Sequence, residues 1–181
     1  MTRGLLSRNI LNESGFNVES DICGDPALLM PLIYKCDNNH IESKTVGIVP
    51  HVSEVEEVRH LLNEEKGYKL IDFRTKDVDK TIRELVSCSF IYSSSLHGLI
   101  LCHAYGIPCL WFQVHSFSGG NFKFNDHFSA VGIIPYRPLS IDEVNKGVRL
   151  TPHEESVSKE IIYKIQKELI ARAPFPIKAK L

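Results

Sequence analysis

Residues 87–112 constrain the fold of this chain more than any other stretch of its sequence. Residues 90–92 (FIY) form a short apolar run of β-forming side chains, and the serines that follow include Ser95, the predicted N-cap of a helix. Apolar residues then recur at helical spacing up to Gly106, a residue type that often ends helices, and residues 109–112 (CLWF) form a second apolar run. A strand, a helix and a strand of this length predict a right-handed parallel crossover.

The same alternation extends toward the N-terminus. Apolar runs at 46–49, 68–71, 90–92 and 109–112 are separated by segments with helical periodicity, which is typical of a parallel sheet with helices on both faces. We therefore predict an α/β, Rossmann-like fold. With 181 residues, of which 43% are hydrophobic, the chain is expected to form one domain over residues 1–181, with an amphipathic helix at about 153–172.

Charge and cysteine content exclude several function classes. Lys and Arg total 21 and Asp and Glu total 22, so the net charge of −1 provides no basic surplus for binding nucleic acid. The five cysteines form no CxxC pair and lie mostly in apolar stretches, which indicates reduced thiols rather than disulfides or a zinc site. No stretch approaches the roughly 20 apolar residues of a membrane span. We expect a cytoplasmic protein without a secretion signal or membrane anchor.

Polar residues follow the predicted strands at the edge where open parallel sheets bind their ligands. His51 follows the first strand, Arg74 the second, and Ser94, Ser95 and His97 the third. The first turn of a helix has free N–H groups that favour an anion, so the imidazole there is expected to be neutral unless an anionic ligand offsets the helix dipole. This arrangement suits phosphate-ester chemistry, although a serine-capped helix with one histidine is also compatible with a purely structural role.

Metal and cofactor motifs are missing from the sequence. It contains no HExxH, Walker loop or GxGxxG, so we expect neither a metal nor a dinucleotide cofactor. His97 and His103 are six residues apart and therefore lie on different faces of a helix. Farther along, residues 113–121 contain Gly119-Gly120 and predict a loop able to move over a ligand, after which Lys123 is a candidate anion contact.

Three stretches occur in an order that is specific when they are taken together. They are residues 24–29 (GDPALL), residues 93–108 with SSSLHGLI and HAYGIP, and residues 123–132 with KFNDHF and Val131-Gly132. Together they resemble the polysaccharide pyruvyl transferase family, and the resemblance covers about residues 3–135. It implies transfer of a pyruvyl group from phosphoenolpyruvate, as donor substrate, to two hydroxyls of a sugar in a bacterial surface or wall polysaccharide, giving a cyclic ketal.

Roles for the strand-end residues follow from this resemblance. His97 would serve as acid and base, because the reaction needs proton donation to carbon and proton removal from oxygen. Ser94, Ser95 and the backbone N–H of Leu96 would hold an anionic group, and Arg74 would neutralise charge on the leaving phosphate.

His51, Arg3 and Lys123 complete the candidate substrate-binding residues. Arg3 is included because the Arg3-Gly4 pair resembles a segment that, in the family, faces the cleft from the second domain.

The sequence departs from the family in two respects. Many members have an arginine directly before the Leu-His pair, where this chain has Ser95. Members usually contain two Rossmann-like domains arranged as in GT-B glycosyltransferases, and this chain resembles only the second, C-terminal one. The implied partners are phosphoenolpyruvate and a saccharide or lipid-linked glycan acceptor, together with a second copy of the chain or a complementary N-terminal domain.

Other functions remain compatible with the same residues. Half of a GT-B-type glycosyltransferase would use the same strand ends to bind a sugar nucleotide, and a noncatalytic glycan-binding or assembly module would bind saccharide without needing His97. A truncated pyruvyl transferase that is inactive alone is a further alternative.

Overall fold

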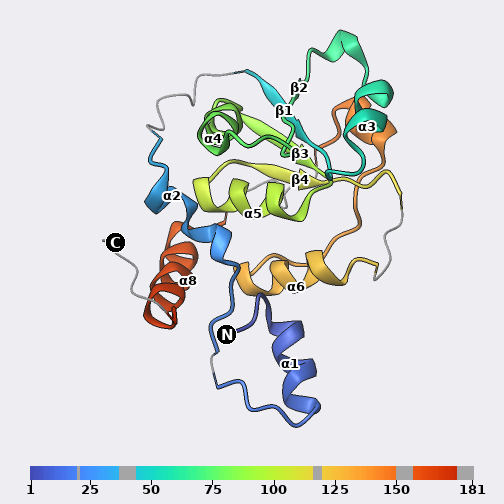
Figure 1. Cartoon of the computed structure of the whole chain (residues 1–181). Coiled ribbons are helices and arrows are strands. Elements are labelled where there is room, and N and C mark those ends of the chain that lie inside the picture. The colour runs from blue at the N-terminus through green and yellow to red at the C-terminus, as the bar shows by residue number, and fades with distance from the viewer. Residues whose placement is uncertain (20, 37–43, 116–119, 150–156, 175–181) are drawn as a thin grey trace.

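The sheet at the centre of the molecule has four parallel strands. The computed structural model describes residues 1–19, 21–36, 44–115, 120–149 and 157–174. Its strands are β1 (Val46–Val49), β2 (Lys69–Leu70), β3 (Phe90–Ser93) and β4 (Cys109–Trp111), in the order β2-β1-β3-β4. β1 pairs with β3 from Val46↔Phe90 to Val49↔Ser93, so these two strands end side by side. The predicted parallel α/β, Rossmann-like sheet is therefore confirmed (Figure 1).

Helices cover both faces of this sheet, as Figure 1 shows. The longer ones are α1 (Leu5–Glu13), α3 (Val55–Leu61), α4 (Val78–Val86), α5 (Leu96–Tyr105), α6 (Phe122–Val131), α7 (Ile141–Lys146) and α8 (Lys159–Ala171). The short ones are η1 (Pro26–Leu29), α2 (Met30–Ile33) and η2 (Glu64–Lys66). None of the helices among the described residues is long and apolar enough to cross a membrane.

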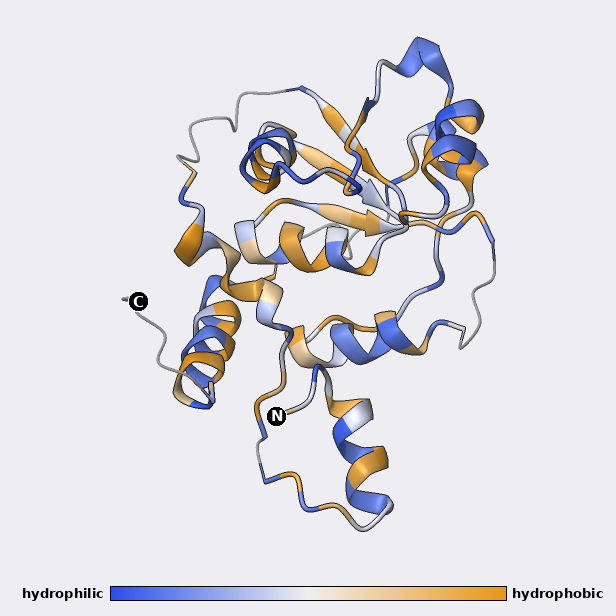
Figure 2. Cartoon of the chain, viewed as in Figure 1, coloured by the Kyte–Doolittle hydropathy of each residue, from blue (hydrophilic) through white to orange (hydrophobic). Residues whose placement is uncertain are grey.

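Two hydrophobic clusters hold the layers together. Because successive strand residues point to opposite faces, Ile91 belongs to a cluster with residues of α4, α5, α6 and α8, whereas Tyr92 belongs to a second cluster with residues of α3 and α7. Figure 2 shows the strands as largely hydrophobic, as expected for a sheet buried on both faces. Both clusters are built from non-adjacent elements, so the layers stabilise one another.

The C-terminal helix differs from the prediction at its start. The helix expected at 153–172 is α8, which begins at Lys159 because Ser158 accepts a hydrogen bond from the backbone N–H of Glu160 as N-cap. Residues 153–156 lie outside the described residues.

The first helix is anchored to the rest of the molecule by a buried carboxylate. Asp126 of α6 is fully buried and accepts hydrogen bonds from the backbone N–H (2.8 Å) and hydroxyl (2.7 Å) of Ser7. The Ser129 hydroxyl accepts one from the backbone N–H of Leu5 (2.9 Å). Gly4 lies so close to the Asp126 carbonyl that a side chain there would collide with it. In Figure 1, α1 accordingly lies beside α6, at the bottom of the view.

Candidate functional site

The turn between β3 and α5 lies at the carboxyl edge of the sheet. Ser93 Oγ accepts a hydrogen bond from the backbone N–H of Ser95 (3.1 Å) and lies 2.9 Å from the Val49 and Ser95 carbonyl oxygens. Ser95 occupies the N-cap position as predicted, but its side chain makes no capping hydrogen bond. The hydroxyl of an N-cap serine usually accepts a hydrogen bond from the first turn of the helix, whereas here the Ser93 hydroxyl organises the turn.

The start of α5 therefore keeps unbonded backbone donors. The N–H groups of Leu96, His97 and Gly98 have no hydrogen-bond acceptor within the part of the chain that the structure describes. Ser95 is buried, whereas the His97 side chain is exposed. Free N–H groups at a helix start favour an anion, so this turn combines an anion-binding surface with an accessible imidazole.

A hydrogen-bonded chain joins this turn to the loop after β1. The Ser94 hydroxyl accepts a hydrogen bond from the backbone N–H of His51 (2.9 Å) and donates one to Glu54 Oε2 (2.7 Å). Ser94 is fully buried, and its own N–H donates to the Val49 carbonyl (3.0 Å). The structure thus brings His51 and Ser94 together, and the Ser94 hydroxyl is already hydrogen-bonded on both sides.

Arg74 is engaged by carboxylates of its own surroundings. Its guanidinium lies 2.6 Å from both Asp72 Oδ2 and Glu56 Oε1, and its hydrogen bonds lower the pKa of both acids. It follows β2, and β1 separates β2 from the strand that leads to His97. The carboxylates of Asp72 and Glu56 already pair with the Arg74 guanidinium, so a leaving phosphate would have to compete with them for this cation.

Arg3 and Lys123 lie at the α6 side of the molecule. Arg3 Nε is 3.7 Å from Asp126 Oδ2, and about a third of the Arg3 side chain is exposed. Lys123 belongs to the first turn of α6, with its ammonium 5.1 Å from the centre of the Phe124 ring. The loop expected at 113–121 is described only in part, because residues 116–119 lie outside the described residues.

Two buried histidines next to this region were not predicted as site residues. His103 Nδ1 and His127 Nε2 are 2.9 Å apart, and the two rings are stacked. Burial lowers the pKa of His127, and the nearby charges of His103, Arg3 and His97 lower it further. His127 lies within the KFNDHF stretch and four residues before Val131, so helical spacing places it on the buried face of α6.

We expect the burial of His127 to make stability depend on pH. The folded protein resists protonating His127, whereas the unfolded chain takes up the proton with a pKa near 6.5, so the contribution of His127 to stability should fall below about pH 6.5 and stay level above it. The slope should approach about 1.4 kcal/mol per pH unit per histidine. Urea unfolding from pH 5 to 7.5 measures it, and His127→Gln should flatten it. His60→Gln, at an exposed position of α3, should leave the slope unchanged; a slope that persists in His127→Gln would contradict the assignment.

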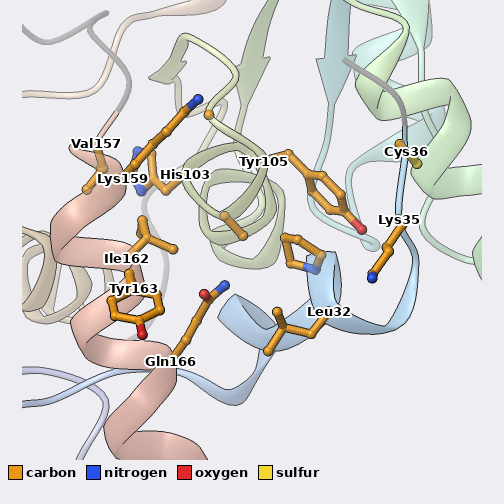
Figure 3. A pocket seen from close by; sticks show the side chains of 13 residues that line it. Leu32, Lys35, Cys36, His103, Tyr105, Val157, Lys159, Ile162, Tyr163 and Gln166 are labelled. Carbon is orange, nitrogen blue, oxygen red and sulfur yellow. The ribbon is translucent and has the colours of Figure 1, made fainter. Parts of the chain in front are cut away.

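A cavity of about 580 Å³ lies elsewhere, between α2, α5 and α8. Figure 3 shows Leu32 of α2, Tyr105 at the end of α5, and Tyr163 and Gln166 of α8 around it. His97 belongs to the opposite end of α5, so this cavity is separate from the strand-end residues. Across the described residues, no group of His, Cys, Asp and Glu side chains is arranged to hold a metal ion.

Comparisons with known proteins match the part of the chain that contains the sheet and the turn between β3 and α5. Residues 1–116 match the family described as polysaccharide pyruvyl transferase. An uncharacterized protein of Acanthamoeba polyphaga mimivirus is 32% identical over 121 residues, which is 65% of this chain and 42% of the viral protein. The chain therefore spans less than half the length of this curated relative. No solved structure matches the chain. The matched residues 1–116 include β1 to β4 and the turn that carries His97.

Proposed function

Because the chain belongs to the polysaccharide pyruvyl transferase family, we propose that it transfers a pyruvyl group from phosphoenolpyruvate to two hydroxyls of a sugar, forming a ketal on a surface or wall polysaccharide. The observation that supports this proposal most directly is the start of α5, where three unbonded backbone N–H groups adjoin the exposed His97. Phosphoenolpyruvate carries a phosphate and a carboxylate, and either anion suits such a helix start.

His97 has the acid and base role in this reaction. Its imidazolium gives a proton to the methylene carbon of phosphoenolpyruvate while a sugar hydroxyl attacks the central carbon, and the neutral imidazole then takes up the hydroxyl proton. The carbon–oxygen bond to phosphate breaks, and the second hydroxyl attacks the same carbon and gives its proton to the departing phosphate. The products are the cyclic ketal and inorganic phosphate. Solvent exposure of His97 supports this role, because the group must reach both substrates.

The cation for the donor is assigned to Arg3 rather than Arg74. Two carboxylates lie within 2.6 Å of the Arg74 guanidinium, whereas Arg3 lies 3.7 Å from the single carboxylate of Asp126. The charges of Arg3 and His97 both act on His127, which supports placing the two side chains in the same neighbourhood. Arg3 would thus replace the arginine that many family members have where this chain has Ser95. His51 and Lys123 remain proposed substrate contacts, and the acceptor is proposed to bind partly to a second domain or a second copy of the chain.

Binding of phosphoenolpyruvate tests this proposal. At about 100 times its dissociation constant the ligand should stabilise the protein by roughly 2.7 kcal/mol, which raises the melting temperature by about 5–10 °C. Arg3→Ala should reduce the shift, whereas Arg172→Ala, which changes an arginine paired with Glu168 at the end of α8, should not. A shift with uridine diphosphate but not with phosphoenolpyruvate would indicate a glycosyltransferase half instead. No shift with either would contradict a donor site in this chain.

A further inference from the structure

Glu54 places a buried carboxyl group at the edge of the sheet that carries His51 and His97. It lies in the turn between β1 and α3, and only 3% of the residue is exposed. Glutamate is almost never this buried unless it is paired with a cation. Glu54 forms no ion pair with the described residues, and its Oε1 is buried without a hydrogen-bond partner among them. The burial of this side chain is therefore unusual and calls for a reason.

The other carboxyl oxygen connects two parts of the site. Oε2 accepts a hydrogen bond from the Ser94 hydroxyl (2.7 Å), and Ser94 Oγ accepts one from the backbone N–H of His51 (2.9 Å). Ser94 is three residues before His97 and directly precedes the N-cap of α5. The side chain of Glu54 thus holds the loop after β1 and the turn after β3 in one arrangement.

Stability alone does not explain this carboxyl group. Burying a polar group that is only half satisfied costs free energy, and replacing a whole buried polar pair by apolar side chains of similar volume is often neutral or stabilising. Natural proteins keep such costly groups where function needs them. His51 and His97 both follow strands that end side by side, so a small shift of one turn changes the distance between them.

We propose that Glu54 is a positioning residue, which acts through Ser94 to hold the turn that carries His97 against the loop that carries His51. The expected effect of Glu54 on turnover rests on the proposed pyruvyl transfer, whereas its expected effect on the positions of the two turns does not. Misplacing a reacting group by about 1 Å can lower a rate about 100-fold. Loss of the Glu54–Ser94 bond should therefore lower turnover and leave the binding of phosphoenolpyruvate nearly unchanged.

Three variants separate this role from a simple packing role. Glu54→Gln keeps an oxygen acceptor for Ser94, whereas Glu54→Met keeps the volume and removes the acceptor. In the double variant Ser94→Ala with Glu54→Met both partners are absent, so no buried hydroxyl is left unpaired. Glu65→Met is the matched control, because Glu65 is an exposed glutamate and its side chain has no hydrogen-bond or ion-pair partner among the described residues.

The first readout needs no substrate. In the ligand-free protein, Glu54→Met should shift the imidazole proton resonances of His51 and His97 but not that of His60, while Glu54→Gln and Glu65→Met should leave all three in place. Glu54→Met leaves the buried Ser94 hydroxyl without its acceptor and should therefore lower the melting temperature, whereas the double variant removes that hydroxyl and should recover part of the loss. Unchanged His51 and His97 resonances in Glu54→Met would overturn the proposal.

The second readout uses phosphate release from phosphoenolpyruvate with the methyl glycosides of glucose, galactose and mannose. Glu54→Met and the double variant should both show a kcat about ten- to hundredfold below wild type, with KM for phosphoenolpyruvate within about twofold. Equal losses indicate that the two residues act as one unit. A wild-type kcat in Glu54→Met would overturn the positioning role while leaving the proposed function intact. Shifted resonances in a protein that never releases phosphate would instead support the positioning role and contradict the proposed function.

Discussion

Replacing His97 by alanine is expected to lower the turnover of pyruvyl transfer by about 10²–10⁴-fold while the melting temperature stays within a degree or so of wild type. The factor is that of a positioned acid or base, and in the proposed reaction this imidazole both protonates the methylene carbon and takes the proton of the first attacking hydroxyl. Stability should hold because the side chain is exposed, and surface changes usually have small effects. Phosphate release from phosphoenolpyruvate measures turnover, and thermal unfolding measures stability.

Two controls make this result specific. His60→Ala changes another exposed histidine, on α3, and should retain full activity. Added imidazole should restore part of the turnover of His97→Ala if the lost group moved protons, but not if it only shaped the turn. Wild-type turnover in His97→Ala would assign the proton transfers to another residue.

Gly98→Ala should produce the largest loss of stability among single changes at this edge. Alanine at an exposed helix position would stabilise the helix by about 1 kcal/mol relative to glycine. Here the added methyl group would collide with Ser93 Oγ and lie 2.8 Å from Val49 Cγ1. Overpacking costs about 1–3 kcal/mol and occasionally more, and Ser93 cannot yield without losing its bonds within the turn. With a cost at the upper end of this range and the gain in helix propensity subtracted, we expect a net loss of about 2 kcal/mol, or about 4–8 °C in melting temperature.

A double-mutant cycle checks the cause of this loss. Ser93→Ala removes the oxygen that the new methyl group meets, so the double variant with Gly98→Ala should be less destabilised than the sum of the two single changes. Gly67→Ala is the comparison for backbone strain alone, because Gly67 has a φ of 61° and open space around it; its cost should stay near 1–2 kcal/mol. Additive effects of Ser93→Ala and Gly98→Ala would contradict a direct collision.

Much of the fold could be predicted because its determinants are local in sequence. Apolar runs gave the positions of β1 and β3, and the break at Gly106 gave the end of α5, where the glycine has a φ of 69°. The alternation of strands and helices then left a parallel sheet as the natural arrangement. The start of α8 was misplaced because charged residues continue the helical pattern upstream, and only the cap at Ser158 marks the boundary.

The partners of the site residues could not be predicted in the same way. Arg74 contacts Glu56, and Ser94 contacts Glu54, across 18 and 40 positions of sequence, and periodicity carries no information about such pairs. One signal was nevertheless present. Glu54 is the N-cap residue of α3 and precedes the buried Val58 by four residues, so helical spacing places it above the inward face of this helix. When the sequence pattern places a glutamate at a buried position, a polar partner for its carboxyl group can be expected.

The short strand β2 limits one way in which chains can associate, by adding strands at the edge of a sheet. Its two residues form one edge of the sheet, and near the opposite edge the segment around Leu139 pairs with Phe112, just after β4. Long, flat edge strands are the templates on which chains aggregate by adding strands to one another, and an edge of two residues offers too few backbone groups to fix a register. The association proposed above, with a second domain or a second copy, would therefore depend on matching side-chain surfaces and not on strands added to this edge.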